Sequence, residues 1–261
     1  MSAIALPLDV DVDRAAPAAV GGVVSATGVV RRYGEGATAV EALRGVSLGI
    51  EAGRMTAIMG PSGSGKSTLM HLLAGLDTPT EGSIVLDGAE ITGLSERKLT
   101  QLRRDTIGFV FQFFNLLPML TAEENVTLPL SIAGRKVDRE WLATLLDEVG
   151  IAERRDHRPA ELSGGQQQRV AVARALVTKP KVVFADEPTG NLDSQSSKDV
   201  LSLLRRAVDE WGQTIVMVTH DAGAAALADR ILFIADGRIV RDLEESTAAE
   251  VLAAMQEVSS K

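Results

Sequence analysis

The 261-residue sequence contains no cysteine and only three histidines. Without cysteine there are no disulfides, no thiolate metal ligands and no cysteine nucleophiles, which fits a reducing compartment. Three histidines provide little material for a zinc centre. The chemistry of this chain must therefore depend on other side chains.

Long apolar runs are also missing. The longest segments without charge, Thr106–Ala122 and Ala15–Val30, are shorter than the roughly 20 apolar residues of a membrane-spanning helix. Asp9, Asp11 and Asp13 stand where a secretory signal would have early basic charge. The 27 Lys and Arg against 35 Asp and Glu give a net charge of −8, which is no electrostatic footprint for nucleic acid. These features predict an acidic, cytoplasmic protein with no span of its own and no nucleic-acid partner.

Short apolar runs alternate with helical patterns along most of the chain. Several of the runs are nearly continuous and β-branched, which is typical of strands buried on both faces of a sheet. Helical patterns at Ser67–Ala74 and over residues 200–208 separate them. This alternation predicts an α/β fold with a mostly parallel sheet. The expected strands are Val46–Ile50, Met55–Met59, Ile84–Leu86, Ile107–Val110, Val182–Ala185, Thr214–Val218 and Ile231–Ala235.

The middle of the chain has a different pattern. Residues 113–162 contain no convincing strand, and apolar residues over 141–149 repeat with helical spacing. Asp138 is expected to cap the start of that helix and Gly150 to follow its end. This segment therefore indicates a helical insertion into the α/β domain.

The two ends of the chain carry less information. Residues 1–22 are rich in Ala, Pro and Asp and are interpreted as a leader without a regular element. Leu243–Lys261 is expected to form a C-terminal helix anchored by Val251 and Leu252. Neither segment suggests a role in chemistry.

One motif predicts a phosphate-binding site. Gly60–Ser67 matches G-x-x-x-x-G-K-[ST], and it follows an apolar strand and precedes a helical pattern. Its glycines let successive N–H groups face an anion, Lys66 supplies charge to the β- and γ-phosphates, and Ser67 can ligate Mg²⁺. The plainer alternative is a Gly/Ser loop that only turns from strand to helix, but the position of the motif between an apolar strand and a helical pattern favours the phosphate site. The residues expected to bind nucleotide here are Gly60, Pro61, Ser62, Gly63, Ser64, Gly65, Lys66 and Ser67.

A pair of acids ends the apolar run from Val182. Asp186 and Glu187 are adjacent, and successive side chains of a strand point to opposite sides, so the two can take different roles. Asp186 is expected to hold Mg²⁺, and Glu187 to accept a proton from the attacking water. Taken alone, two acids at a strand end would be solvated surface groups; beside a phosphate loop they favour nucleotide hydrolysis.

The segment Leu162–Gln166 reads LSGGQ and precedes a helical run. Ser163 and Gln166 have the spacing of a capping box. The capping box does not explain Gly164 and Gly165, which leave the helix N-terminus bare so that a phosphate can approach the backbone.

With these motifs the sequence resembles the nucleotide-binding subunit of an ABC (ATP-binding cassette) transporter, whose signature is LSGGQ. The resemblance covers Val23 to Arg241, and the motifs stand in the family's order: phosphate loop, Gln112, signature, Asp186-Glu187 and His220. It implies a P-loop NTPase core of RecA type with an antiparallel β subdomain. It also implies an ATPase domain over 23–241, a helical signature subdomain over about 113–165 and a helical tail over 242–261.

The resemblance also implies roles for single residues. Tyr33 matches the aromatic that stacks on adenine, and Thr68 would reach the α- or β-phosphate. Gln112 matches the glutamine that contacts Mg²⁺ and the attacking water, and His220 the histidine that contacts the γ-phosphate. Asp193 matches the loop that crosses between subunits, where Gly190-Asn191 is a variant of the commoner Ser-Ala.

In this family the signature of one subunit closes over ATP held by the phosphate loop of another. The implied partner is therefore a second copy of the chain, with ATP and Mg²⁺ as cofactors. The signature residues that would contact the partner's nucleotide are Ser163, Gly164, Gly165 and Gln166.

The segments 108–130 and 185–193 are similar to one branch of the family, the ATPases of lipoprotein-release, macrolide/peptide-export and cell-division systems (MacB, LolD and FtsE types). The resemblance implies an integral membrane permease encoded separately and a peripheral location on the inner face of the membrane. An apolar cluster follows Gln112 and fits either a helical-domain core or a groove for a permease helix. Its members are Phe113, Phe114, Leu116, Leu117 and Met119.

A rival hypothesis is a soluble ABC-type ATPase that acts as a scaffold or regulator, or on ribosomes or DNA. The single phosphate loop, the single signature and the absence of long heptad runs disfavour the ribosome and DNA classes. Glu187 and His220 disfavour a scaffold that binds ATP without hydrolysing it.

Overall fold

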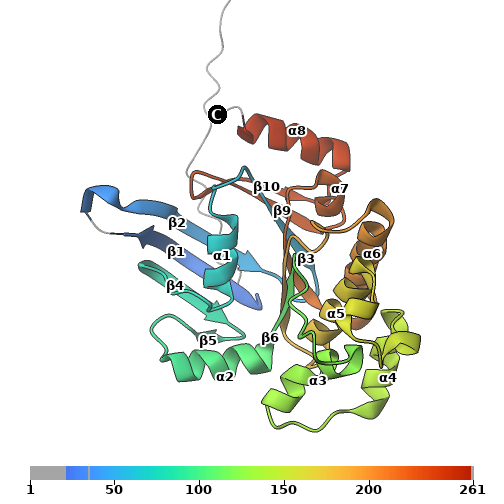
Figure 1. Ribbon diagram of the computed structural model, residues 1–261. Helices are drawn as coiled ribbons and strands as arrows, with labels where there is room; N and C mark the ends of the chain where they lie inside the picture. The colour runs from blue at the N-terminus through green and yellow to red at the C-terminus, as the bar shows by residue number, and fades with distance from the viewer. Residues whose placement is uncertain (1–21, 35, 260–261) are drawn as a thin grey trace, which may run out of the picture.

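The computed structural model describes residues 22–34 and 36–259 (Figure 1). Its centre is a six-stranded sheet of order β10-β9-β3-β8-β7-β6, in which β10 is antiparallel to β9 and the other neighbours are parallel. A second sheet, of order β2-β1-β4-β5, is antiparallel. The strands are β1 Val24–Tyr33, β2 Val40–Ile50, β3 Met55–Met59, β4 Glu81–Leu86, β5 Ala89–Glu90, β6 Ile107–Phe111, β7 Val182–Asp186, β8 Thr214–Val218, β9 Arg230–Ala235 and β10 Arg238–Glu244.

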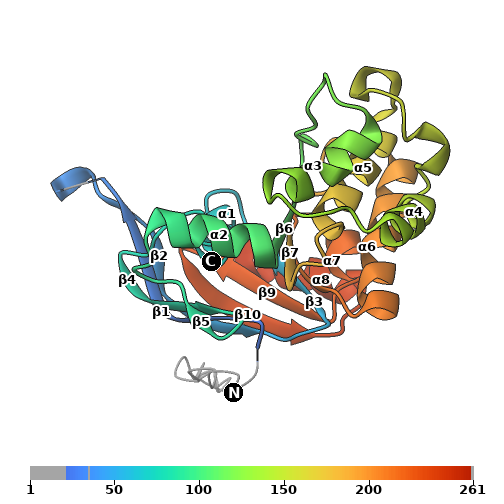
Figure 2. The same cartoon turned by 90° about the horizontal axis from the view of Figure 1, so that it is seen from below.

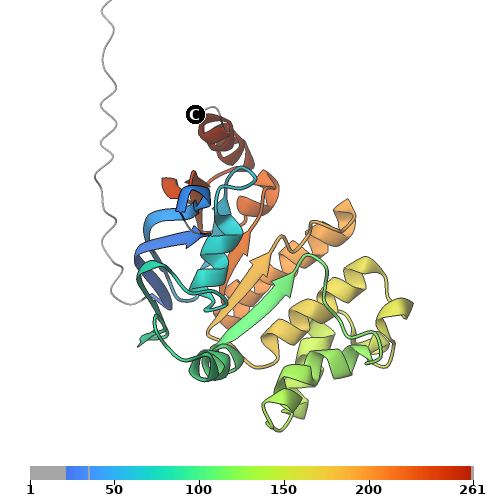
Figure 3. The same cartoon turned by 60° about the vertical axis from the view of Figure 1, so that its left-hand side comes forward.

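Helices cover both faces of the six-stranded sheet and form a separate group at one side. Figures 2 and 3 show α3, α4 and α5 gathered beyond the edge where β6 lies. The α-helices are α1 Lys66–Leu73, α2 Glu96–Thr106, α3 Ala122–Ile132, α4 Arg139–Glu148, α5 Gly164–Leu176, α6 Ser194–Trp211, α7 Ala222–Ala225 and α8 Ala248–Ser259; short 3-10 turns lie at Gly36–Thr38, Ala152–Arg154 and Pro159–Glu161.

Two hydrophobic clusters pack on opposite faces of the parallel strands. Within β3, Ile58 belongs to a cluster with α1 and the antiparallel sheet, whereas Ala57 and Met59 belong to one with α3 to α8. This alternation follows from the two-residue period of a strand. The helix that follows the phosphate loop, α1, and the signature helix, α5, consequently lie on opposite faces of the sheet.

The predicted architecture is confirmed. All seven expected strands are present, and the predicted α/β core carries an antiparallel β sheet and a helical group between β6 and β7. Asp138 caps α4 by accepting from the backbone N–H of Trp141, and Gly150 follows its end with φ 68°. The strands β1, β5 and β10 were not predicted from the sequence.

The C-terminal prediction is partly wrong. A helix, α8, does occupy most of the tail, and Val251 is fully buried. Leu252, however, is 52% exposed, and the second buried residue of α8 is Ala254. Adjacent residues of a helix point about 100° apart, and α8 turns Val251 rather than Leu252 toward the core. The strand β10 also runs to Glu244, past the boundary expected at Arg241, and residues 1–21 of the predicted leader lie outside the described residues.

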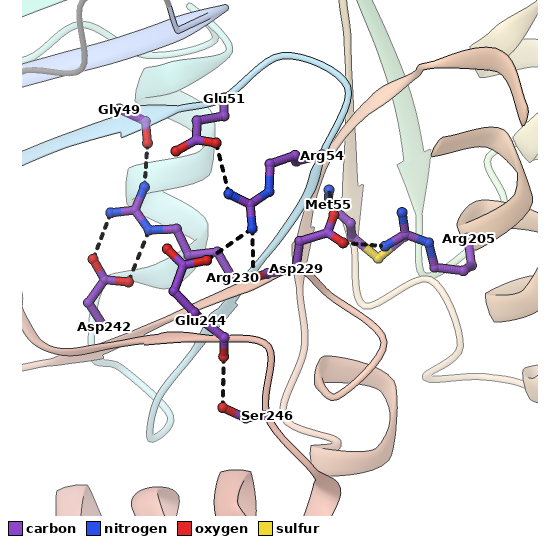
Figure 4. Close-up of polar contacts among 10 residues, drawn as sticks. All are labelled: Gly49, Glu51, Arg54, Met55, Arg205, Asp229, Arg230, Asp242, Glu244 and Ser246. Atoms are coloured by element: carbon purple, nitrogen blue, oxygen red, sulfur yellow. Dashed lines mark hydrogen bonds and ion pairs between the residues drawn. The ribbon is translucent and has the colours of Figure 1, made fainter. Parts of the chain in front are cut away.

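A polar network joins the two sheets at the edge where β3 begins (Figure 4). Arg54 donates to Glu51 and Glu244, and these hydrogen bonds raise its pKa. Asp229 accepts from the backbone N–H of Met55 and from Arg205. The network anchors the sheet at the end opposite the phosphate loop.

Within residues 22–34 and 36–259, none of the helices has the length and apolar character of a membrane span.

Candidate nucleotide-binding site

The predicted site residues meet where adjacent parallel strands end. Val218 pairs with Ile58 on one side and with Asp186 on the other, and Asp186 pairs with Phe111. The residues that follow these strands therefore gather at one edge of the sheet, the usual ligand edge of an open α/β sheet. This edge holds the phosphate loop after β3, Glu187 after β7, His220 after β8 and Gln112 after β6.

The phosphate loop wraps the start of α1. Gly65 is the N-cap of α1 and has φ 105°, and a Cβ there would lie 2.6 Å from the carbonyl oxygen of Ala42. Only glycine fits this position. Lys66 donates from Nζ to the carbonyl oxygens of Gly60 (2.9 Å) and Pro61 (2.8 Å). The loop thus curls around its own lysine, whose charge stays inside the ring of backbone groups.

Burial and charge shape the titration of this edge. Burial lowers the pKa of Lys66, and the negative charges of Glu187 and Asp186 act in the opposite direction. Burial raises the pKa of Asp186, as does the charge of Glu187, whereas the charges of His71 and Lys66 lower it. Lys66 and Asp186 therefore each affect the pKa of the other, and the charge of Glu187 affects both.

The residues present fit a nucleotide phosphate and Mg²⁺. Ser64 Oγ is buried and has no hydrogen-bond partner among the described residues, so a polar group is left facing the loop. The described residues contain no cluster of three His, Cys, Asp or Glu that could hold a metal alone. A hydroxyl from Ser67 and a carboxylate from Asp186 suit Mg²⁺, which takes few protein ligands and completes its shell with phosphate and water.

Glu187 and His220 are in direct contact. His220 Nδ1 lies 2.6 Å from Glu187 Oε2, with the histidine side chain 68% exposed and the glutamate side chain 23% exposed. Glu187 has φ 46°, a left-handed conformation uncommon for a residue other than glycine. Its backbone N–H donates to the carbonyl of Val218, which ties the turn to β8. The two residues predicted to perform hydrolysis are thus brought together.

Gln112 is paired with the loop that follows Glu187. The side-chain amide of Asn191 donates to the Gln112 carbonyl at 3.0 Å, and Gln112 Nε2 donates to Asn191 Oδ1 at 3.4 Å. A Cβ on Gly190 would lie 2.7 Å from Gln112 Nε2. The Gly-Asn variant noted in the sequence therefore has a structural reason: glycine makes room for Gln112 and asparagine binds it.

The signature forms the N-terminus of α5. Ser163 is the N-cap, and the predicted capping box with Gln166 is confirmed, since each side chain bonds the other residue's backbone N–H. Ser163 is exposed. Asp193, predicted to serve nucleotide binding, caps α6 by accepting from the N–H groups of Gln195 and Ser196. The hydrogen bonds from Ser196 lower the pKa of Asp193.

Tyr33 ends β1 and keeps part of its ring accessible, with 42% of the residue exposed. Its hydroxyl donates to Asp77 at 2.7 Å, and the Arg31 guanidinium lies 4.5 Å from the ring centroid. Stacking on adenine remains a prediction.

Two polar residues of α5 were missed by sequence reasoning. Gln168 is fully buried, and Arg174 donates to the carbonyls of Phe114 and Asn115. Gln168 bonds the carbonyls of the residue before Gln112 and the residue after Glu187, and the carbonyls that Arg174 bonds are two and three residues past Gln112. The available signal was a polar residue within the apolar pattern of the helix. Such a residue is expected to be buried with a hydrogen-bond partner, because buried polar groups are nearly always hydrogen-bonded.

The parallel sheet and phosphate loop define a P-loop ATPase of the α/β class. The sequence pattern of the ABC transporter family matches residues 43–190, which is more than half of the chain. The chain belongs to the ABC transporter family as an ATP-binding ATPase.

Named relatives agree with this assignment. A LolD protein, the lipoprotein-releasing system ATP-binding protein of Syntrophotalea carbinolica, is 48% identical over 83% of this chain and 96% of its own length. The macrolide export ATP-binding/permease protein MacB of Bdellovibrio bacteriovorus is 50% identical over 82% of this chain. The match covers only 33% of MacB, so the chain spans about a third of that relative.

A solved structure has the same fold. An ATP-binding cassette determined as a dimer, in a post-hydrolysis state with ADP and Pi, superposes with a TM-score of 0.77 at 42% identity. The superposition covers 86% of this chain and 99% of that one.

Proposed function

We propose that two copies of this chain close around ATP and Mg²⁺, and that hydrolysis and reopening drive an integral membrane permease of the MacB, LolD or FtsX type. The observation that carries the proposal is the separation of the two phosphate-facing elements within one chain. The helix α1 follows the phosphate loop on one face of the sheet, and α5 carries the signature on the other. The exposed Ser163 end of α5 is then available to a partner's nucleotide.

In this cycle the phosphate loop and Lys66 bind the nucleotide phosphates, and Ser67 and Asp186 hold Mg²⁺. Glu187 accepts a proton from the attacking water, and His220, already in contact with it, lies at the γ-phosphate. ATP favours the closed dimer because it contacts both copies there and only one copy in the open state.

The permease is proposed to dock beside Gln112. Part of the predicted apolar cluster lies on the surface, with Phe113 73% exposed and Met119 71% exposed. Next to it, a groove of about 340 Å³ runs between β6 and α3, and the 72%-exposed Ile132 lies at its wall. This supports the docking interpretation over a helical-domain core, with an apolar cytoplasmic segment of the permease as occupant. Such docking places the protein on the cytoplasmic face of the membrane.

The cycle is tested by measuring phosphate release at several protein concentrations with saturating Mg-ATP. Two chains per site predict that activity per chain rises with concentration, whereas a complete site in each chain predicts a constant value. Docking is tested with Ile132→Glu, which should weaken capture by a MacB- or LolD-type permease in detergent. Unchanged basal ATPase activity in this variant separates the docking surface from the nucleotide site, and undiminished capture would refute the docking assignment.

A further inference from the structure

Gln168 is a fully buried polar side chain in the first half of the signature helix. Its Nε2 donates to the carbonyl oxygen of Phe111 at 3.2 Å and to that of Pro188 at 2.5 Å. An oxygen at this position would face two carbonyl oxygens, so the orientation of the amide is fixed by its partners. Gln168 Oε1 is buried without a partner among the described residues, so the two bonds from Nε2 are what offset the cost of burying the amide.

The two carbonyls stand at adjacent points of the catalytic edge. Phe111 is the last residue of β6 and precedes Gln112; Pro188 follows Glu187 at the end of β7. The ladder between the two strands ends with the pair Phe111 and Asp186. In the part of the chain that the structure describes, the β6–β7 ladder does not continue past that pair, and the Gln168 amide joins the two segments just beyond it.

The turn that Gln168 holds is under backbone strain. Glu187 has φ 46°, and residues other than glycine are strained in this left-handed conformation and persist there only where several contacts fix them. Here the contacts are the Glu187 N–H on the Val218 carbonyl, the Gly190 N–H on the Glu187 carbonyl and Gln168 on the Pro188 carbonyl. Gln168 is the only one of these that comes from the signature helix.

A second residue of α5 holds the far end of the Gln112 loop. Arg174 donates to the carbonyls of Phe114 (2.7 Å) and Asn115 (2.6 Å), which both have left-handed φ values, 58° and 50°. The segment from Phe111 to Asn115, which contains Gln112, is therefore bonded to α5 at both ends. Gln168 binds its first residue, and Arg174 binds its last two.

We infer that Gln168 is a positioning residue for hydrolysis: through two main-chain carbonyls it holds Gln112 and Glu187 in fixed relation to each other and to the signature helix. The inference rests on the proposed function, in which these two residues act on the attacking water. The signature helix thereby sets the geometry of two sites, its own through Gln168 and the partner's through Ser163.

The test replaces the amide with a side chain of similar size that cannot donate. Gln168→Met should lower kcat at saturating Mg-ATP by between about tenfold and a hundredfold, because small misplacements of reacting groups have effects of this size. The affinity of the chain for ATP should change less than about twofold, since Gln168 contacts no residue of the phosphate loop among the described hydrogen bonds. This split between kcat and affinity is not expected of a general loss of stability.

Two control variants separate positioning from packing. Gln167→Met makes the same change one residue earlier, where the side-chain amide bonds the carbonyl of Leu162. Asn125→Leu removes another fully buried amide, one that bonds backbone groups in the second half of the loop before α3 and at the N-cap of α3. Both should keep kcat within about twofold of the wild type, measured at a temperature where each variant is folded.

A kcat for Gln168→Met equal to that of the controls would overturn the inference. If the methionine variant does not fold, Gln168→Glu has the same shape and presents oxygen to both carbonyls, and the same loss of kcat is expected. A wild-type chain without ATPase activity would instead refute the proposed function, so the two failures are distinguishable.

Discussion

His220 Nδ1 contacts Glu187 Oε2 at 2.6 Å, although the two residues follow different strands. The contact depends on the parallel pairing of β7 and β8, which places Asp186 opposite Val218. It also depends on the left-handed turn at Glu187. The fold alone therefore brings the proposed base, Glu187, into contact with His220, the residue proposed to contact the γ-phosphate.

Glu187→Gln should remove the base while keeping the shape of the site. We expect phosphate release to fall by about 10²–10⁴-fold, the range for loss of a general base, with ATP binding preserved. His220→Ala should also slow turnover but leave Glu187 able to accept a proton. Turnover of Glu187→Gln at the wild-type rate would remove Glu187 as the base.

Lys66→Ala should weaken ATP binding directly. A hydrogen bond to a charged group contributes about 1.5–3 kcal/mol, which corresponds to about a tenfold to hundredfold loss of affinity. Lys66 also bonds the carbonyls of Gly60 and Pro61, so the loop itself should become less ordered. Titration with a fluorescent ATP analogue measures the effect, with Lys179→Ala, at the far edge of the sheet beside Trp141, as the control. Equal affinity in the Lys66 variant and the wild type would contradict the assignment.

Ser163→Arg should block dimer closure, because a long charged side chain would stand where the partner's phosphates approach α5. Ser163→Ala removes the cap, at a cost of about 1 kcal/mol of helix stability, and the hydroxyl proposed to contact the partner's nucleotide, but it leaves room for closure. We expect the arginine variant to bind ATP like the wild type and to lose both dimer closure and hydrolysis, and the alanine variant to close with ATP and to hydrolyse it more slowly than the wild type. Full hydrolysis by Ser163→Arg would show that the signature does not complete a partner's site.

Gly190→Ala should displace Gln112. The new Cβ would meet Gln112 Nε2 at 2.7 Å, so the amide has to shift away from Asn191. We expect kcat to fall by about twofold to tenfold. The double variant Gly190→Ala with Gln112→Ala should be no slower than Gln112→Ala alone, since the crowded atom is gone. Additive losses in this cycle would place the effect of Gly190 elsewhere.

The sequence predicts the parallel core well because buried strands have a strong local signal. Met55–Met59 and Thr214–Val218 are wholly apolar or β-branched, and the structure places β3 and β8 over those same residues. The strand β1 was missed because it is half exposed, contains Gly28 and changes register against both of its neighbours. Its place in the sheet depends on pairing with β2 and β4 rather than on an apolar pattern of its own.

The candidate site also contains a part that can be predicted from local sequence and a part that cannot. The phosphate loop, the signature and Glu187 are contiguous motifs whose spacing can be read directly. The Gln112–Asn191 pair and the contacts of Gln168 join residues far apart in the chain, and only the fold brings them together. Leu252 shows the reverse error, because two adjacent apolar residues were assigned to one face of a helix that buries only Val251 of the two.

The claim that each ATP is shared by two copies is tested most directly by the mass of the Glu187→Gln chain in solution as ATP is added. Light scattering coupled to size exclusion should show a shift from one chain to two with ATP, and no shift when Lys66→Ala is added to the same chain. A chain that binds ATP and keeps the mass of a single copy at every ATP concentration would contradict the account.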